Sequence, residues 1–314
     1  MSEGQANNRA WWGIVLPSGE GAATRRLVFR ETYGQGSSPV AGPEHDLPEA
    51  ALGRATQLVE GNRLIAVLGH GDRARLRNAQ TGCVVLEEPA RRGTCPSVFL
   101  AVTYILAREP EATALIFPLD ATPVGNGHLL KAVERAARLA DRFDDRLVML
   151  AVEPGWPHSE LGWVEPGPVL ENCQGGELLA VRRFWDTPGP LEAELFLKRG
   201  YLRSTMIIAV KVRTLWSLGR EVFPEMMKRF ESLLDVCKLV MAGRANPELE
   251  TLALRDVYRG LETINFARRV LHRMPDRIAL LPLRSGAAQD RGTASRSSAD
   301  SDQLPAPPTR LRLA

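Results

Sequence analysis

Cysteine is scarce in this chain of 314 residues, and no cysteine has a second one nearby in the sequence. The four are Cys83, Cys95, Cys173 and Cys237. This spacing excludes a zinc knuckle, a paired redox motif and a dense disulfide framework. We therefore expect reduced thiols, as in a cytoplasmic protein.

Excess charge and long apolar runs are lacking as well. The 40 basic and 37 acidic residues leave a net charge of +3, too little to indicate a nucleic-acid-binding protein. The first apolar run, 11–16, follows a polar lead and is too short for a signal peptide or a membrane span. The composition, 44% hydrophobic and 25% charged, is that of a globular protein with one large core or two modest ones.

Short apolar runs alternate with helical patterns over the first half of the chain. Predicted strands lie at 11–16, 63–68, 83–86, 114–117 and 147–152. Predicted helices lie at 47–59, 72–80 and 128–141, and a further helix opens within 90–99, with Pro96 in its first turn, and runs to about 108. This alternation predicts an α/β fold with three layers, in which a doubly wound, mostly parallel, Rossmann-like sheet lies between helices.

The pattern changes after residue 152. Strands at 162–165 and 180–185 have no helix between them, which predicts an antiparallel or mixed insertion. A helix at 191–199, a strand at 206–210, a helical stretch at about 212–272 and a strand at 278–283 follow. We expect one domain over 11–283, a flexible start at 1–10 and a disordered tail at 284–314.

The stretch 11–27 predicts a phosphate-binding loop. A strand breaks into Gly19, Glu20 and Gly21 and continues into a helix start that carries Arg25. Free backbone N–H groups and the positive end of a helix then meet at one point, as a phosphate requires. An ordinary tight turn with a solvated arginine is the alternative.

Asp120 follows the predicted strand 114–117, so its carboxylate lies at the carboxyl end of a strand. Ligands bind at that edge of open α/β sheets, and Mg²⁺ prefers carboxylate oxygens. A helix-capping role before Thr122 and Pro123 is the alternative.

Six segments, in order, resemble the sugar-phosphate nucleotidyltransferases, and mannose-1-phosphate guanylyltransferases in particular. The glycine loop resembles that family's Gly-Gly-x-Gly-Thr-Arg-Leu. The other five are Pro89–Ser97 (Pro-x-Asn-Arg-x-Thr-Ala-Pro-Ala), Phe117–Asp120 (Pro-Ser-Asp-His), Pro157–Glu165 (Pro-Glu-Thr-Gly-Tyr-Gly-Tyr-Ile-Glu), Val181–Pro188 (Val-x-x-Phe-x-Glu-Lys-Pro) and Gly200–Met206 (Gly-x-x-Trp-Asn-Ser-Gly). The resemblance covers residues 11 to 283.

The resemblance implies an activity. A sugar 1-phosphate attacks the α-phosphate of a nucleoside triphosphate, most similarly mannose 1-phosphate and GTP, and pyrophosphate leaves with Mg²⁺ present. It implies catalytic roles for Arg25 and Asp120, with Asp120 also binding the metal. The implied nucleotide-binding residues are Gly19, Glu20, Gly21, Arg92, Gly93, Thr94 and Pro96, and the implied sugar-phosphate residues are Gly162, Glu165 and Asp186.

This chain departs from the family pattern at charged positions. Without a gap the loop arginine falls on Ala23, and a two-residue insertion places it at Arg25. Thr187 replaces the lysine of Glu-Lys-Pro, and Arg203 begins the segment that corresponds to Trp-Asn-Ser-Gly. A catalytically degenerate homologue, acting as a nucleotide-binding or regulatory subunit with an oligomeric or protein partner, is therefore the alternative. Glu165 and Asp186 then are solvated carboxylates.

Overall fold

The computed structural model describes residues 10–16, 47–69, 82–118, 126–157, 159, 162–173 and 176–283. The chain divides into two compact units, Met1–Arg284 and Ser285–Ala314. The second unit lies outside the described residues, and the fold is that of the first.

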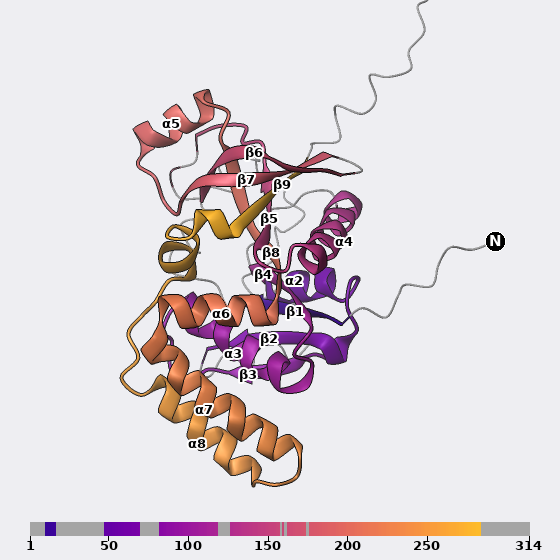
Figure 1. Ribbon diagram of the computed structural model, residues 1–314, viewed down its shortest axis with the longest axis vertical. Coiled ribbons are helices and arrows are strands. Elements are labelled where there is room, and N and C mark those ends of the chain that lie inside the picture. Colours follow the sequence, from indigo (N-terminus) through magenta and orange to yellow (C-terminus); the bar gives the residue numbers. More distant parts are fainter. Residues whose placement is uncertain are drawn as a thin grey trace, which may run out of the picture. The chain divides into compact units, whose positions relative to one another are not determined.

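A single sheet of nine strands, in the order β3-β2-β1-β4-β8-β5-β9-β7-β6, organises the described residues (Figure 1). The strands are β1 (Trp11–Leu16), β2 (Leu64–Leu68), β3 (Val84–Glu87), β4 (Thr113–Pro118), β5 (Leu147–Val152), β6 (Trp163–Cys173), β7 (Gly176–Trp185), β8 (Leu202–Lys211) and β9 (Ile278–Leu283). The helices are α2 (Leu47–Ala55), α3 (Thr94–Arg108), α4 (Asn126–Arg142), α5 (Pro190–Lys198), α6 (Val212–Val222), α7 (Pro224–Met241) and α8 (Pro247–Tyr258).

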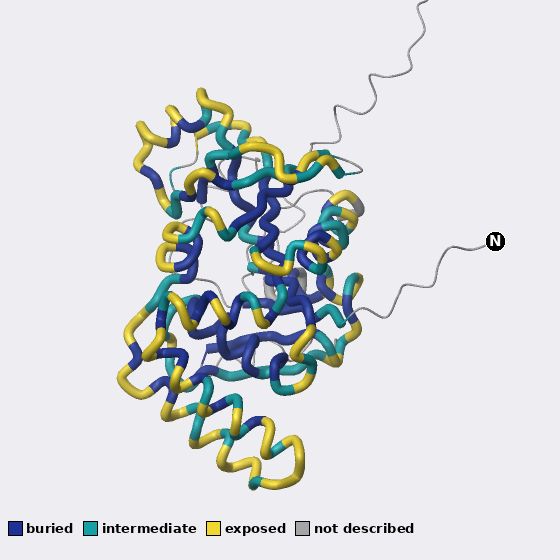
Figure 2. Tube along the Cα trace, viewed as in Figure 1, coloured by how far each residue is buried: buried dark blue, intermediate teal, exposed yellow. Residues whose placement is uncertain are grey.

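Strand β1 lies between β2 and β4, parallel to both, and is buried along nearly its whole length. Its side chains alternate between two cores, because successive residues of a strand face opposite sides of the sheet. Trp12 and Ile14 join a core with α3, α6 and α7, whereas Val15 joins a second core with α2 and α4. Figure 2 shows the buried strands between these helices. The three-layer α/β fold predicted from the sequence is confirmed.

Strand β8 lies antiparallel between β4 and β5, which makes the sheet mixed. The first residues of β6 also pair with β8, with Trp163 opposite Arg203. Strands β8, β5, β9, β7 and β6 therefore form a closed circuit.

Strand β6 is longer than the 162–165 predicted, and it reaches Cys173. Its pairing with β7 is irregular at three places between Glu165 and Glu171. Pro166 and Pro168 lie in this stretch, and proline cannot donate a backbone hydrogen bond to a sheet.

Three α-helices occupy much of the stretch predicted to be helical at 212–272. Helices α7 and α8 lie side by side, separated by a break at which the Asn246 side chain accepts a hydrogen bond from the Glu248 amide and begins α8. Residues 259–265 are not helical, and a π-helical turn, Ala267–Leu271, follows Phe266. None of the helices in the described part of the chain is long and apolar enough to cross a membrane.

One predicted helix ends earlier than expected, and another lies outside the described residues. The helix predicted at 47–59 ends at Ala55, and the predicted 72–80 is not described. Helix α5 matches its prediction, and Gly200 follows it with φ +71°, the left-handed conformation in which glycine commonly ends a helix.

Candidate functional site

The carboxyl ends of β1 and β4 mark the edge at which ligands bind in open α/β sheets. These strands end at Leu16 and Pro118, directly before the segments that carry several predicted site residues. Those residues, Gly19, Glu20, Gly21, Arg25 and Asp120, lie outside the described residues, and their roles stay predictions. In the described part of the chain no three carboxylate, histidine or thiol groups gather as metal ligands.

The predicted nucleotide-binding loop before α3 contacts a remote part of the chain. Gly93 precedes α3 with φ +81°, and an added Cβ there would lie 2.5 Å from the carbonyl oxygen of Ile264. The Ile264 amide donates to the carbonyl of Arg92 (2.9 Å), and its carbonyl accepts from the Cys95 amide (3.0 Å). The Thr94 hydroxyl accepts from the Phe266 amide (2.9 Å).

Two further residues of this loop are partly or wholly withdrawn from solvent. Pro96 is buried in the first turn of α3, where proline is tolerated because that turn has no amide partner of its own. The buried Nε of Arg92 has no hydrogen-bond partner among the described residues. The nucleotide-binding role of the loop stays a prediction.

The residues Ile264–His272, here called the bridging segment, continue from this loop to the end of β7. Figure 1 shows the segment, in gold, between β7 and helices α3 and α6. Nδ1 of His272 donates to the carbonyl of Phe184 (2.7 Å). Nε of Arg268 donates to Oδ2 of Asp186 (2.9 Å), and its Nη2 donates to the hydroxyl of Thr187 (3.2 Å). One short segment therefore connects the predicted nucleotide and sugar-phosphate residues.

Gly162 and Asp186 lie near each other, since Trp163 pairs with Trp185. The carbonyl of Gly162 accepts from the Ser204 amide (2.8 Å), and an added Cβ there would lie 3.0 Å from the Phe184 ring. Gly162 thus has a packing role in this structure.

Glu165 lies farther along β6 and is 20% exposed, with a carboxylate oxygen 4.0 Å from Nη1 of Arg182. Trp163 is fully buried and Trp185 packs on Phe196, at a ring-centroid distance of 4.5 Å. Both tryptophans are therefore packing residues in this structure.

The start of β8 is a buried polar stretch, Arg203–Thr205, beside the carboxyl end of β5. The Thr205 hydroxyl donates to the carbonyl of Leu150 (2.8 Å), and the Ser204 hydroxyl accepts from the Met206 amide (3.0 Å). Met206 has φ +57°, which among the described residues no other non-glycine residue shares. A side chain in this left-handed region costs about 1–2 kcal/mol.

Glu88 is a buried carboxyl group that sequence reasoning missed. Its Oε1 accepts from the hydroxyls of Ser97 (2.9 Å) and Tyr258 (2.8 Å), which connects the end of β3 to α3 and α8. Burial raises the pKa of Glu88 to about 7, although both hydrogen bonds and the nearby charge of Arg91 act in the opposite direction. No local sequence signal identifies the pair, because Tyr258 lies 170 residues from Glu88.

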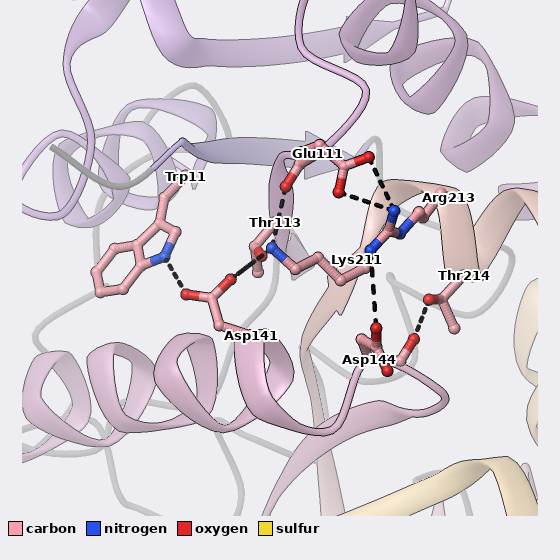
Figure 3. Close-up of polar contacts among 8 residues, drawn as sticks. All are labelled: Trp11, Glu111, Thr113, Asp141, Asp144, Lys211, Arg213 and Thr214. Atoms are coloured by element: carbon pink, nitrogen blue, oxygen red, sulfur yellow. Dashed lines mark hydrogen bonds and ion pairs between the residues drawn. The ribbon is translucent and has the colours of Figure 1, made fainter.

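A second polar cluster lies at the opposite, amino end of the parallel strands (Figure 3). Asp141 accepts hydrogen bonds from Thr113 (2.6 Å) and Trp11 (3.2 Å), and Nζ of Lys211 lies 2.8 Å from its Oδ1. Burial raises the pKa of Asp141, but these bonds and the Lys211 charge outweigh burial and hold that pKa below its ordinary value.

A cavity of about 290 Å³ adjoins this cluster, lined by residues that include Asp144, Arg213 and Thr214. Arg213 pairs with Glu111 (2.8 Å) and Asp144 (3.7 Å), and the Thr214 hydroxyl donates to the Asp144 carbonyl. Because these groups bind one another, we assign the cluster to folding, and the candidate site to the carboxyl edge.

Comparison with known proteins bears on the fold alone. No protein-family model matches the chain, and no curated protein matches its sequence. Solved structures do match: one described as mannose-1-phosphate geranyltransferase from Thermus thermophilus has a TM-score of 0.68 and 22% identity, over 88% of this chain and 74% of that one. Another, described as mannose-6-phosphate isomerase from Helicobacter pylori, has a TM-score of 0.60 and 17% identity, over 88% of this chain and 98% of that one. The chain therefore shares the fold of these two structures.

Proposed function

We propose that this protein transfers a nucleoside monophosphate from a nucleoside triphosphate to a sugar 1-phosphate and releases pyrophosphate. Guanylyl and mannose 1-phosphate are the first pair to test, because the ordered sequence segments resemble mannose-1-phosphate guanylyltransferases most and a structural neighbour is described as acting on mannose 1-phosphate. The partners are then two small phosphorylated molecules, and we propose neither nucleic acid nor membrane as a partner. A cytoplasmic location is part of the same proposal.

The observation that carries this proposal is the backbone of Met206. In the segment Gly200–Met206 the resembling family has glycine at the last position, and Met206 has φ +57°. Glycine adopts that region without strain, whereas methionine does not. The backbone at Met206 is thus one that the glycine of the motif adopts without strain, although this chain has methionine there. The remaining described segments also lie at strand ends, where a ligand site is expected.

Mg²⁺ belongs to the proposal through Asp120 alone. Its carboxylate is the type of ligand that this hard cation prefers. Because the described residues bring no group of three such ligands together, they add nothing to this site. We therefore assign Mg²⁺ no step, and the described residues act by binding and orienting the two phosphorylated substrates.

The second candidate is a catalytically degenerate homologue that binds a nucleotide or regulates a partner. The contacts of Thr94 and Asp186 favour it, because the Thr94 hydroxyl and the Asp186 carboxylate bind the bridging segment. The reaction also requires cations on several phosphate oxygens, and Thr187 replaces one of them.

Pyrophosphate release separates the two candidates. The full chain is incubated with Mg²⁺, each nucleoside triphosphate in turn and a panel of sugar 1-phosphates, and GTP binding is measured by calorimetry. Turnover with any pair supports the transferase. Binding of GTP without turnover contradicts the transferase and supports the degenerate homologue, and absence of both contradicts both candidates.

A further inference from the structure

The guanidinium of Arg268 is held in place by two residues that follow β7. Its Nε and Nη2 donate to Asp186 and Thr187, at 2.9 and 3.2 Å. These two nitrogens form one edge of the planar group. The other edge, Nη1 with the second hydrogen of Nη2, has no acceptor among the described residues. Two parallel N–H donors on this edge match two oxygens of a phosphate.

Burial differs sharply between the partners. The Asp186 side chain is 13% exposed, whereas that of Arg268 is 64% exposed. The Asp186 carboxylate is thus enclosed and orients the guanidinium of Arg268, which itself stays in contact with solvent. A pair exposed to this degree adds little to stability, about 0–1 kcal/mol, so stability alone is a weak reason for the arrangement.

Strand pairing places this cation near the candidate site. Asp186 follows Trp185, which pairs with Trp163, which in turn pairs with Arg203. Arg203 also pairs with Val152, the last residue of β5. Arg268 therefore lies three strand pairings from the carboxyl end of β5, on the side of the fold that carries Gly162.

We propose that Arg268 binds the phosphate group of the sugar 1-phosphate, with Asp186 and Thr187 as positioning residues. The inference rests on the proposed function. The resembling family has a lysine where this chain has Thr187, and the inference assigns the positive charge of that lysine to Arg268, 81 positions later. The guanidinium of Arg268 donates a hydrogen bond to Thr187 itself. Asp186, predicted as a direct sugar ligand, then acts through Arg268.

Steady-state kinetics and calorimetry on the full chain test this inference. For Arg268→Ala we expect the KM for the sugar 1-phosphate to rise about 10- to 100-fold, as for a lost hydrogen bond to a charged group, with the KM for the nucleotide nearly unchanged. Arg268→Lys keeps the positive charge but lacks the two parallel N–H donors. Its KM for the sugar 1-phosphate should therefore lie between those of wild type and Arg268→Ala. Asp186→Asn should raise the same KM less, and adding it to Arg268→Ala should have little further effect.

Arg269→Ala is the matched control, because this neighbouring arginine is also exposed and its guanidinium lies over the Phe223 ring, away from Asp186. It should leave both KM values unchanged. In calorimetry, mannose 1-phosphate should bind Arg268→Ala more weakly than wild type. Glucose 1-phosphate should also bind the variant more weakly than wild type. Phosphate-free mannose should bind both proteins equally.

The outcomes separate this inference from the proposed function. Turnover by wild type with an unchanged KM for the sugar 1-phosphate in Arg268→Ala overturns the inference and leaves the proposed function standing. Absence of turnover, with binding of mannose 1-phosphate that depends on Arg268, overturns the proposed function and supports the inference. Failure of wild type to bind either sugar 1-phosphate overturns the inference, as does equal weakening for sugar and sugar phosphate.

Discussion

The carbonyl oxygen of Ile264 lies where a side chain on Gly93 would begin, 2.5 Å from an added Cβ. Gly93 also has φ +81° and ψ 179°, a region that in practice only glycine enters. This close approach joins the loop before α3 to the bridging segment.

Gly93→Ala is therefore expected to lower the free energy of unfolding by about 2 kcal/mol or more, since strain and a backbone clash act together. Urea denaturation measures the loss. Gly243→Ala is the control: it has φ +67° with no atom within 4 Å of an added Cβ, so about 1 kcal/mol is expected. Faster hydrogen exchange at the Phe266 amide should accompany the first change alone, and equal losses for both would contradict the clash.

At Met206 we expect a glycine variant to be more stable than an alanine variant, which is the reverse of the usual order. Both Met206→Ala and Met206→Gly remove the side chain, but only alanine keeps the strain at φ +57°. We expect the glycine variant to be more stable than the alanine variant by about 1 kcal/mol, measured by thermal and urea unfolding. At Leu170, whose φ is negative, glycine should be the less stable of the two. The same order at both positions would argue against strain at Met206.

The raised pKa of Glu88 predicts that the free energy of unfolding falls as pH rises. The pKa of Glu88 is about 7 in the folded chain against an ordinary 4.5, so the folded state holds a proton that the unfolded state releases. Its contribution is complete below pH 4.5 and is lost as pH rises through about 7. The loss amounts to about 3 kcal/mol.

Glu88→Gln should remove this dependence, because the amide oxygen still accepts from Tyr258 and Ser97 without ionising. Urea unfolding of both proteins from about pH 4 to about pH 8 measures the difference. A constant difference between them across that range would show that the ionisation of Glu88 is not coupled to folding.

The lowered pKa of Asp141 predicts that the free energy of unfolding changes with pH in the opposite direction. Its pKa is lowered, so its contribution is present above the ordinary carboxyl pKa and is lost as pH falls through the folded value. Asp141→Asn should cost about 1–3 kcal/mol at neutral pH, because Lys211 loses its ion pair and one of the hydrogen bonds weakens. The cost should shrink at acid pH.

Asp144→Asn is the control for this cluster. Asp144 is 59% exposed and 3.7 Å from Arg213, so a change within about 0.5 kcal/mol is expected. A cost at Asp144 equal to that at Asp141 would assign the effect to the charge of the whole cluster rather than to the contacts drawn in Figure 3.

The buried strands could be predicted from sequence because an apolar run such as Trp11–Leu16 or Leu147–Val152 has the length of a strand and is too short for a typical helix. The direction of β8 could not, since a run buried on both faces carries no sign of which neighbours it pairs with. The full extent of β6 was missed because prolines are typical of strand ends.

The site was predictable where its chemistry is local and not where it is assembled by the fold. Gly93 and Asp186 could be selected because the segments that carry them, Pro89–Ser97 and Val181–Pro188, resemble motifs of a known family. The partners of these residues could not, because Ile264 and Arg268 reach them from the far end of the domain. The adjacent arginines 268 and 269 were the available signal, and they fell in a stretch that was interpreted only as helical.

The two ends of the sheet bear on how copies of this chain can associate. At one end β3 has four residues. At the other, the first residues of β6 pair with β8, and the strand then carries Pro166 and Pro168 and three irregularities in its pairing with β7. A short strand and a strand with prolines are poor templates for a further strand from another molecule. Addition of a strand from another molecule at these two edges of the described sheet should therefore be unfavourable.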